Sequence, residues 1–302
     1  MTTIVVAYDL SVEADRAVAV VAATAWPADT VVHVVTSIRG LGGGLSSFAG
    51  SHETQRHAQD VRASVASAHE RVAARLAEAD VAVETAVVVG APARAVVDAA
   101  RATDADLIVA GAAHRSSIVA TLAGSVSGRI VEEAHCAVLV VRVESLERVV
   151  LATDGSPAAE AALELVAGSP LFAGSEVRVV GVVLPPSRYT ESVLSGDEVV
   201  DTYAEDLDAH HTQSRVAVDH AVDRLVVAGR RADGYIRVGA AADEIARAVN
   251  EWPADVIVLG SRGTSLVRRV LLGTVTRSIA EKVGSSVVVV RPTTGDGDAP
   301  GD

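Results

Sequence analysis

Short apolar runs alternate along this chain with longer stretches in which apolar residues recur at helical spacing. The apolar runs at 4–8 and 149–153 are typical of buried strands, and each precedes an Ala-rich helical stretch, at about 11–25 and 157–168. Strand and helix alternate with short turns between them. The pattern therefore predicts an α/β fold with parallel, doubly wound sheets and right-handed crossovers.

The same order of elements is predicted twice. Each further element is expected once in each half. The expected strands are 31–36 and 177–183, 106–110 and 255–259, and 138–142 and 287–291, with one more pair ending at Gly90 and Gly239. The expected helices are at about 54–79 and 203–230, 93–103 and 242–251, and 126–134 and 275–283. Aligned without gaps, residues 86–142 and 235–291 are identical at about a third of positions. Shared composition does not keep identities in register, so the pattern indicates a duplicated domain.

Two tandem domains, 1–145 and 146–292, follow from this repeat. The segment 143–148 between them is too short for a free linker, so we expect the domains to pack as a pseudo-dimer. Ser11 and Ser156 precede the first helix of each domain and are predicted N-caps. The tail at 293–302 is rich in Gly, Asp and Pro and is expected to be disordered.

Composition narrows the class of protein further. Apolar residues make up 49% of the 302 residues but aromatic residues only 3%, which favours parallel strands covered on both faces. The net charge of −13 argues against nucleic acid or an anionic membrane as a partner. The single cysteine, Cys136, excludes an intrachain disulfide. The chain has no signal-like start and no apolar run long enough to span a bilayer, so we expect a cytoplasmic protein.

A glycine loop carries the candidate chemistry. The apolar run at 256–259 ends in Gly260, and Gly263 follows after two intervening residues. Nine further residues precede Gly273 and Thr274, which open a predicted helix. Glycines let the backbone approach an anion, and a helix N-terminus offers unpaired N–H groups at its positive dipole end. This arrangement is suited to a phosphate.

An altered copy of the loop occurs in the first domain. It contains Gly111, Gly124 and Ser125, but His114 stands where the second glycine is expected. A Cβ and an imidazole would crowd the phosphates, and a left-handed backbone there would be strained. We therefore predict that the first site binds nucleotide more weakly or prefers a smaller one. A histidine that contacts the ligand is the alternative.

Several nucleotide and catalytic motifs are missing. The chain has no G-x-x-x-x-G-K-[ST] sequence, and Lys282 is its only lysine; no G-x-G-x-x-G after the first strand, no G-x-S-x-G and no H-E-x-x-H occurs. No metal site is predicted. Asp9 and Asp154 end the two first strands, where each could merely hold a turn or cap a helix. Their repetition in register with the loops favours a ligand contact.

The strand-end aspartates, the G-x-x-G spacing and the later G-[ST] together resemble the universal stress protein family, over residues 1–292 and in tandem form. The resemblance implies an adenine-nucleotide α-hydrolase-like fold that binds ATP. It places Asp154, and Asp9 in the first domain, near adenine and ribose, with the backbone of Val182 and of Val34 at adenine. It implies that the phosphates are lined in the second domain by Gly260, Gly263, Gly273, Thr274 and Thr276, with Arg262 as an added charge, and in the first by Gly111, Gly124, Ser125 and Ser127.

The resemblance further implies a stress or dormancy regulator in which nucleotide occupancy sets conformation or the choice of an unknown protein partner. A magnesium ion bridging the phosphates and a homodimer of tandem chains are also expected. Two alternatives stay open. One is a slow ATPase or phosphotransferase, although no general base or loop lysine is evident. The other is an interaction module that binds little nucleotide.

Overall fold

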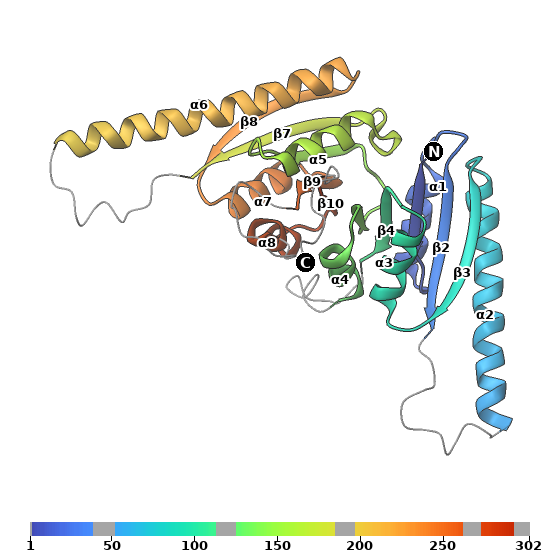
Figure 1. Ribbon diagram of the computed structural model, residues 1–302. Coiled ribbons are helices and arrows are strands. Elements are labelled where there is room, and N and C mark those ends of the chain that lie inside the picture. The colour runs from blue at the N-terminus through green and yellow to red at the C-terminus, as the bar shows by residue number, and fades with distance from the viewer. Residues whose placement is uncertain (1, 39–51, 113–124, 185–196, 262–272, 293–302) are drawn as a thin grey trace, which may run out of the picture. The chain divides into compact units, whose positions relative to one another are not determined.

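The protein is described by a computed structural model over residues 2–38, 52–112, 125–184, 197–261 and 273–292, with the backbone alone placed for 52–55, 57–58 and 197–208. The tail expected to be disordered, 293–302, lies outside these residues. The chain divides into two compact units, the first ending at Glu144 and the second beginning at Ser145. Each is a parallel sheet covered by helices (Figure 1), which confirms the predicted α/β class.

The first unit has the strand order β3-β2-β1-β4-β5, and its neighbouring strands are parallel. Its elements are β1 (Thr3–Ala7), α1 (Val12–Ala22), β2 (Val31–Ile38), α2 (His52–Ala77), β3 (Ala82–Val89), α3 (Pro92–Ala102), β4 (Leu107–Gly111), α4 (Val126–Glu133) and β5 (Ala137–Val141). Helix α1 packs beside α2, and α3 packs beside α4. The helices thus form two pairs around the sheet.

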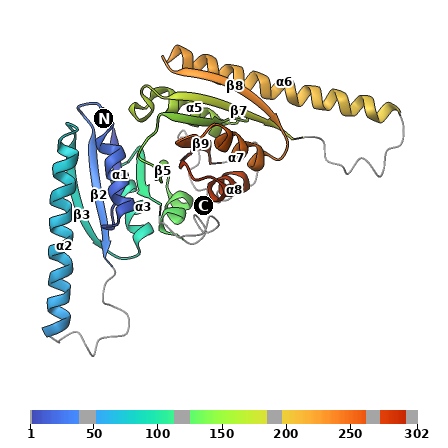
Figure 2. The same ribbon diagram turned by 180° about the vertical axis from the view of Figure 1, so that it is seen from behind.

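The second unit repeats this order as β10-β9-β6-β7-β8, again with parallel neighbours. Its elements are β6 (Arg148–Ala152), α5 (Pro157–Gly168), a 3-10 helix η1 (Pro170–Phe172), β7 (Glu176–Val183), α6 (Asp197–Val227), β8 (Arg231–Val238), α7 (Ala241–Glu251), β9 (Val256–Gly260), α8 (Thr274–Lys282) and β10 (Ser286–Val290). Figure 2 shows α7 and α8 beside each other and α6 running along β8. The helix η1 was not predicted from the sequence.

Polar side chains fix where the first elements of each unit begin. Ser11 Oγ accepts a hydrogen bond from Ala14 N at 3.1 Å, and Ser156 Oγ accepts one from Ala159 N at 3.3 Å. Both N-cap predictions are therefore confirmed. At the opposite edge of each sheet, Asp106 accepts from Thr3 N at 2.8 Å and Asp255 from Arg148 N at 2.9 Å. These two aspartates hold the strand starts together and lie away from the carboxyl ends.

Two glycines let the long helix α6 lie close against β7 and β8 (Figure 1). A Cβ on Gly181 would lie 2.8 Å from the Val218 side chain, and one on Gly234 would lie 2.6 Å from it. Val218 is fully buried between helix and sheet. Only glycine fits at these strand positions while the helix stays where it is.

The first unit has threonines at the corresponding positions. The strand registers show that Thr36 is the structural counterpart of Gly181 and that Thr85 is the structural counterpart of Gly234. His69 is the counterpart of Val218, because each lies thirteen residues before the strand that follows its helix. His69 is buried, and its Nε2 lies 2.7 Å from Thr36 Oγ1. The contact between the long helix and the sheet is thus apolar and tight in one unit and partly polar in the other.

Acidification is expected to weaken the fold through His69. Burial lowers the pKa of its imidazole below the ordinary value of 6.5. As pH drops, the unfolded chain therefore binds a proton near pH 6.5, whereas the folded chain binds it only at a lower pH. The free energy of unfolding falls as pH drops through 6.5, and it levels off below the pKa of the folded state. His69→Gln, which can keep a bond to Thr36, should show a smaller fall in urea unfolding experiments between pH 7 and 5. His135→Gln, at a histidine whose side chain is exposed, is the control.

Candidate functional site

The strand-end aspartates hold the turn that leads into the first helix of each unit. Asp154 Oδ1 accepts from Ser156 N at 3.0 Å, and Asp9 Oδ1 accepts from Ser11 N at 3.1 Å and from the Ser11 hydroxyl. The turn role weighed from the sequence is therefore present. It does not compete with a ligand role, because both carboxylates are exposed at the carboxyl ends of β1 and β6, where ligands bind in sheets of this type.

A cavity of about 130 Å³ lies at this edge of the second unit. It is lined by Asp154 after β6, Val182 on β7, Gly260 at the end of β9 and Thr276 in α8, all four predicted from the sequence. Three further residues that line the cavity were not predicted from the sequence, namely Ala241, Ile245 and Val275. The amphipathic pattern of the helix predicted at 242–251 was the available signal for Ile245, since that pattern marks a face turned toward the sheet.

Gly260 is glycine for a reason that the sequence did not reveal. A Cβ there would lie 2.7 Å from the backbone carbon of Ala158, at the start of α5. In the first unit, a Cβ on Gly111 would lie 2.4 Å from the backbone of Glu13, at the start of α1. Both glycines thus allow the first helix to begin against the end of the fourth strand. That packing opens the edge where a ligand can lie.

The helices that follow the two glycine loops begin differently. Helix α8 starts after Gly273, and among the described residues no side chain at this N-cap position bonds its first N–H groups. Helix α4 starts after Ser125, whose Oγ accepts from Gly128 N at 3.0 Å. The second unit therefore keeps N–H groups at its helix start for an anion, whereas the first uses one of them for its own cap.

Thr276 and Ser127 are buried rather than exposed at the edge, with 5% and 4% of their surface accessible. Thr276 Oγ1 donates to the carbonyl oxygen of Gly260 at 3.1 Å, so its proton already has an acceptor. Ser127 Oγ lies 3.3 Å from Ser125 Oγ. The Thr276 hydroxyl holds α8 against the end of β9. Thr274, which is exposed at the first turn, is better placed to meet a ligand.

The match of Val34 to Val182 is wrong by three residues. Val34 pairs with Val6 in the middle of the sheet and is fully buried, whereas the strand registers make Ser37 the counterpart of Val182. The valines at 31, 32, 34 and 35 lie on both faces of β2, so the apolar pattern gave no signal to fix the register. Ser37, near the carboxyl end of β2, is thus the residue to examine in the first unit.

Three predicted site residues lie outside the described residues, namely Gly124, Arg262 and Gly263. The altered position His114 also lies outside them, as do Arg268 and Arg269. In the described part of the chain, no cluster of three or more His, Cys, Asp or Glu side chains could hold a metal ion. The helices within these same ranges include none with the length and apolarity needed to cross a membrane.

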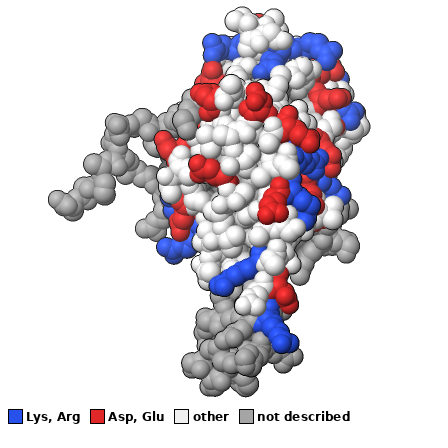
Figure 3. Space-filling view, turned by 90° about the vertical axis from the view of Figure 1, so that its right-hand side faces the viewer, with Lys and Arg blue, Asp and Glu red and all other residues white. Residues whose placement is uncertain are grey.

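Charge on the surface is mixed where it can be seen. Figure 3, which views the molecule from the side that carries α2, shows acidic and basic side chains interspersed around a largely uncharged area. On this face the basic residues do not form one continuous surface of the kind that tracks a nucleic-acid backbone.

Each unit is therefore a doubly wound α/β domain with its candidate ligand site at the carboxyl edge, and the second has a cavity and an uncapped helix there. Comparison with known proteins identifies the group to which such a chain belongs. The sequence profile of the universal stress protein family matches residues 1–142 and again 145–291. The chain belongs to the universal stress protein family, in tandem form, as the sequence motifs predicted.

Individual relatives are distant. The chain is 28% identical over 106 residues to universal stress protein Sll1388 of Synechocystis sp., which covers 35% of this chain and 67% of the relative. A solved universal stress protein from Archaeoglobus fulgidus superposes with a TM-score of 0.66 at 18% identity, covering 96% of this chain and 98% of that one. A putative universal stress protein from Pseudomonas aeruginosa superposes with a TM-score of 0.62 at 15% identity, covering 97% and 94%. These structures share the fold with the present chain.

Proposed function

We propose that the protein binds ATP at the carboxyl edge of its second domain, and that occupancy of this site sets its conformation or its choice of protein partner in a stress response. The observation that carries the proposal is the cavity that brings Asp154, Val182, Gly260 and Thr276 together next to the start of α8. Residues from four elements far apart in sequence meet there, as the motif spacing predicts for an adenine nucleotide.

The residues divide between the two ends of such a ligand. Asp154 and the backbone of Val182 would hold the adenosine part, against the apolar side chains of Ile245 and Leu259. The uncapped N–H groups of α8 and the Thr274 hydroxyl would hold the phosphates through neutral donors and the helix dipole. Magnesium would bridge the phosphates themselves. Thr276 is assigned to positioning, because its hydroxyl is bonded to Gly260.

The first domain is proposed to be the weaker site. Its helix α4 uses the Ser125 side chain as a cap, which occupies the Gly128 N–H that an anion would otherwise meet. The sequence supplies a second difference between the two sites, because His114 stands where the loop of the second domain has a glycine. One chain would then carry one strong and one weak nucleotide site, and the strong site would set the response at low nucleotide concentration.

A glutamate at the start of α8 is expected to weaken ATP binding at least tenfold. Thr274→Glu places a negative charge where the phosphates would lie, while an acidic first-turn residue favours the helix itself, so the fold is retained. Val126→Glu is the matched control, because Val126 is the first residue of α4 and is exposed. Calorimetric titration of ATP into the full chain gives the affinities. Equal losses in both variants would show two equivalent sites, and no loss in either would refute the assigned phosphate position.

The nucleotide that copurifies with the protein separates regulation from catalysis. Bound ATP that stays intact over hours supports the regulator, because occupancy then persists long enough to set a conformation. Steady release of ADP would instead show an ATPase. A chain that neither copurifies with nucleotide nor binds it in titration would be an interaction module. Mass spectrometry of the denatured supernatant, followed over time, distinguishes these outcomes.

A further inference from the structure

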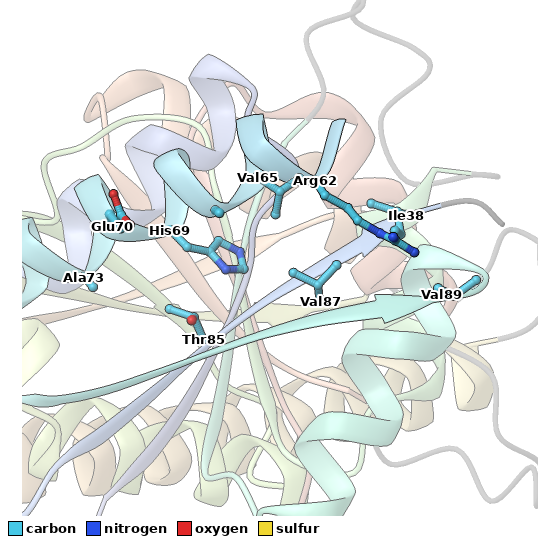
Figure 4. A pocket seen from close by; sticks show the side chains of 10 residues that line it. Ile38, Arg62, Val65, His69, Glu70, Ala73, Thr85, Val87 and Val89 are labelled. Carbon is cyan, nitrogen blue, oxygen red and sulfur yellow. The ribbon is translucent and has the colours of Figure 1, made fainter. Parts of the chain in front are cut away.

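The first domain contains a second cavity, larger than the one at the carboxyl edge. It has a volume of about 650 Å³ and lies between helix α2 and strands β2 and β3 (Figure 4). Ligand sites for small molecules commonly enclose about 300–1,000 Å³. The lining reaches the ends of β2 and β3 at Ile38 and Val89. It does not include Asp9 after β1 or Gly111 at the end of β4, so the cavity is distinct from the candidate site at those two strand ends.

The duplicated domain differs from the first copy at three positions that flank this space. In the second domain, Gly181 and Gly234 let Val218 close the gap between helix and sheet. In the first domain, the same three positions hold Thr36, Thr85 and His69. Both strands thus present a side chain where the second domain has none, and a polar ring replaces the valine. The cavity thus follows from the sequence of the first copy.

The lining of the cavity combines apolar walls with one cation. Val65 on α2 is buried, and Val87 and Val89 on β3 are large apolar residues with 48% and 65% of their surface exposed. Figure 4 shows Arg62 extending from α2 toward Ile38 and Val89, and the Glu70 carboxylate pointing away from the strands. No carboxylate of the described residues pairs with the Arg62 guanidinium. An apolar body with an anionic head is the ligand that satisfies both features.

We propose that this cavity binds a medium-chain carboxylic acid, with its alkyl tail between α2 and the valines of β3 and its carboxylate on Arg62. The valine walls remove the tail from water, and the guanidinium gives the head group a charge-assisted hydrogen bond. Buried His69 also lines the cavity, and because its Nε2 is already bonded to Thr36, the imidazole needs no partner from the alkyl tail. Because this cavity shares no lining residue with the proposed ATP site of the second domain, the acid and ATP can be bound at the same time.

Titration of the full chain with saturated fatty acids below their micelle concentration tests the proposal. Decanoate is expected to bind once per chain, and each methylene from hexanoate to decanoate should strengthen binding about threefold to fourfold, the effect of transferring one methylene from water. Decyltrimethylammonium, with the same tail and the opposite charge, should bind at least tenfold more weakly. ATP should not displace decanoate.

Four variants locate the site. Val87→Trp fills the cavity and should lower decanoate affinity at least tenfold, whereas Ala86→Trp, on the neighbouring exposed residue whose side chain leaves the other face of β3, should not. Arg62→Gln should lower decanoate affinity about fivefold or more and leave decan-1-ol binding unchanged. Arg75→Gln, exposed on the same helix and outside the cavity, is its control. Thermal unfolding establishes that each variant is folded.

Three results would overturn the proposal. The first is that decanoate shows no binding at about 1 mM, which is the order of magnitude of the affinity expected for such a tail. The second is equal affinity for decanoate and decyltrimethylammonium, which would indicate nonspecific uptake of the tail. The third is binding that Val87→Trp leaves unchanged. Concentration-dependent dimerisation that Val87→Trp abolishes, without decanoate binding, would show instead that a second copy of the chain covers the valines.

Discussion

Gly260→Ala is expected to destabilise the second domain by about 3 kcal/mol and to reduce ATP binding with it. The new Cβ would lie 2.7 Å from the carbonyl carbon and 2.8 Å from the carbonyl oxygen of Ala158, both backbone atoms. Neither can rotate away, so α5 must shift from the end of β9; overpacking of this kind costs about 1–3 kcal/mol, or more where backbone is involved. The shift also moves Ala159, which lines the cavity at the carboxyl edge.

The two tryptophans allow this effect to be assigned to one domain. Trp26 lies in the first domain and Trp252 in the second, and the chain has no others. Urea unfolding followed by fluorescence in a Trp26→Phe background reports the second domain alone, which matters because a two-domain chain need not unfold in one step. Gly168→Ala is the control, since a Cβ there meets nothing within 4 Å. A Gly260→Ala protein with the parent's midpoint would show that α5 is not held as described.

Phe172→Ala is expected to cost the second domain about 3–5 kcal/mol, the range for removing a large aromatic side chain from a packed core. Phe172 is fully buried at the end of η1, and it is one of only two phenylalanines in the chain. In a core built mostly of valine and alanine, few neighbouring side chains are long enough to refill the space.

The same single-tryptophan background measures this loss. Val227→Ala, at the exposed last residue of α6, should change the free energy of unfolding by less than about 0.5 kcal/mol. A similarly small effect for Phe172→Ala would mean that η1 is not packed into the core. Trp252 serves well as the reporter, because the Arg178 guanidinium lies 4.4 Å from the centre of its ring only while the second domain is folded.

The order of strands and helices could be predicted from the sequence because the apolar period changes sharply between them. The helix 157–168 was predicted with its observed bounds, since Ser156 and Pro157 mark its start and Gly168 its end. The last strands begin one residue earlier than expected, at Ala137 and Ser286, because a flat run of valines has no boundary signal. The helix η1 was missed because three residues are too few to show any period.

The candidate site could be predicted where chain topology alone positions a residue. Asp154 and Gly260 directly follow or end parallel strands, so they had to meet at one edge. The register of Val34 could not be predicted, because the valines of β2 fall on both of its faces and leave no clear alternation from which to set the register. The structural reason for a glycine at position 260 could not be predicted from the sequence either, since the Ala158 backbone that excludes a Cβ belongs to a helix about a hundred residues earlier.

The glycine pair under α6 has a consequence for how the two copies can be recombined. Grafting α6 onto the first domain would press Val218 against the threonine side chains at Thr36 and Thr85, where it now meets only glycine. Grafting α2 onto the second domain would place the imidazole of His69 over two glycines, with no Thr36 hydroxyl to bond it. Helices of common origin have thus ceased to be interchangeable parts, and a chimera of this protein must exchange each long helix together with both strands beneath it.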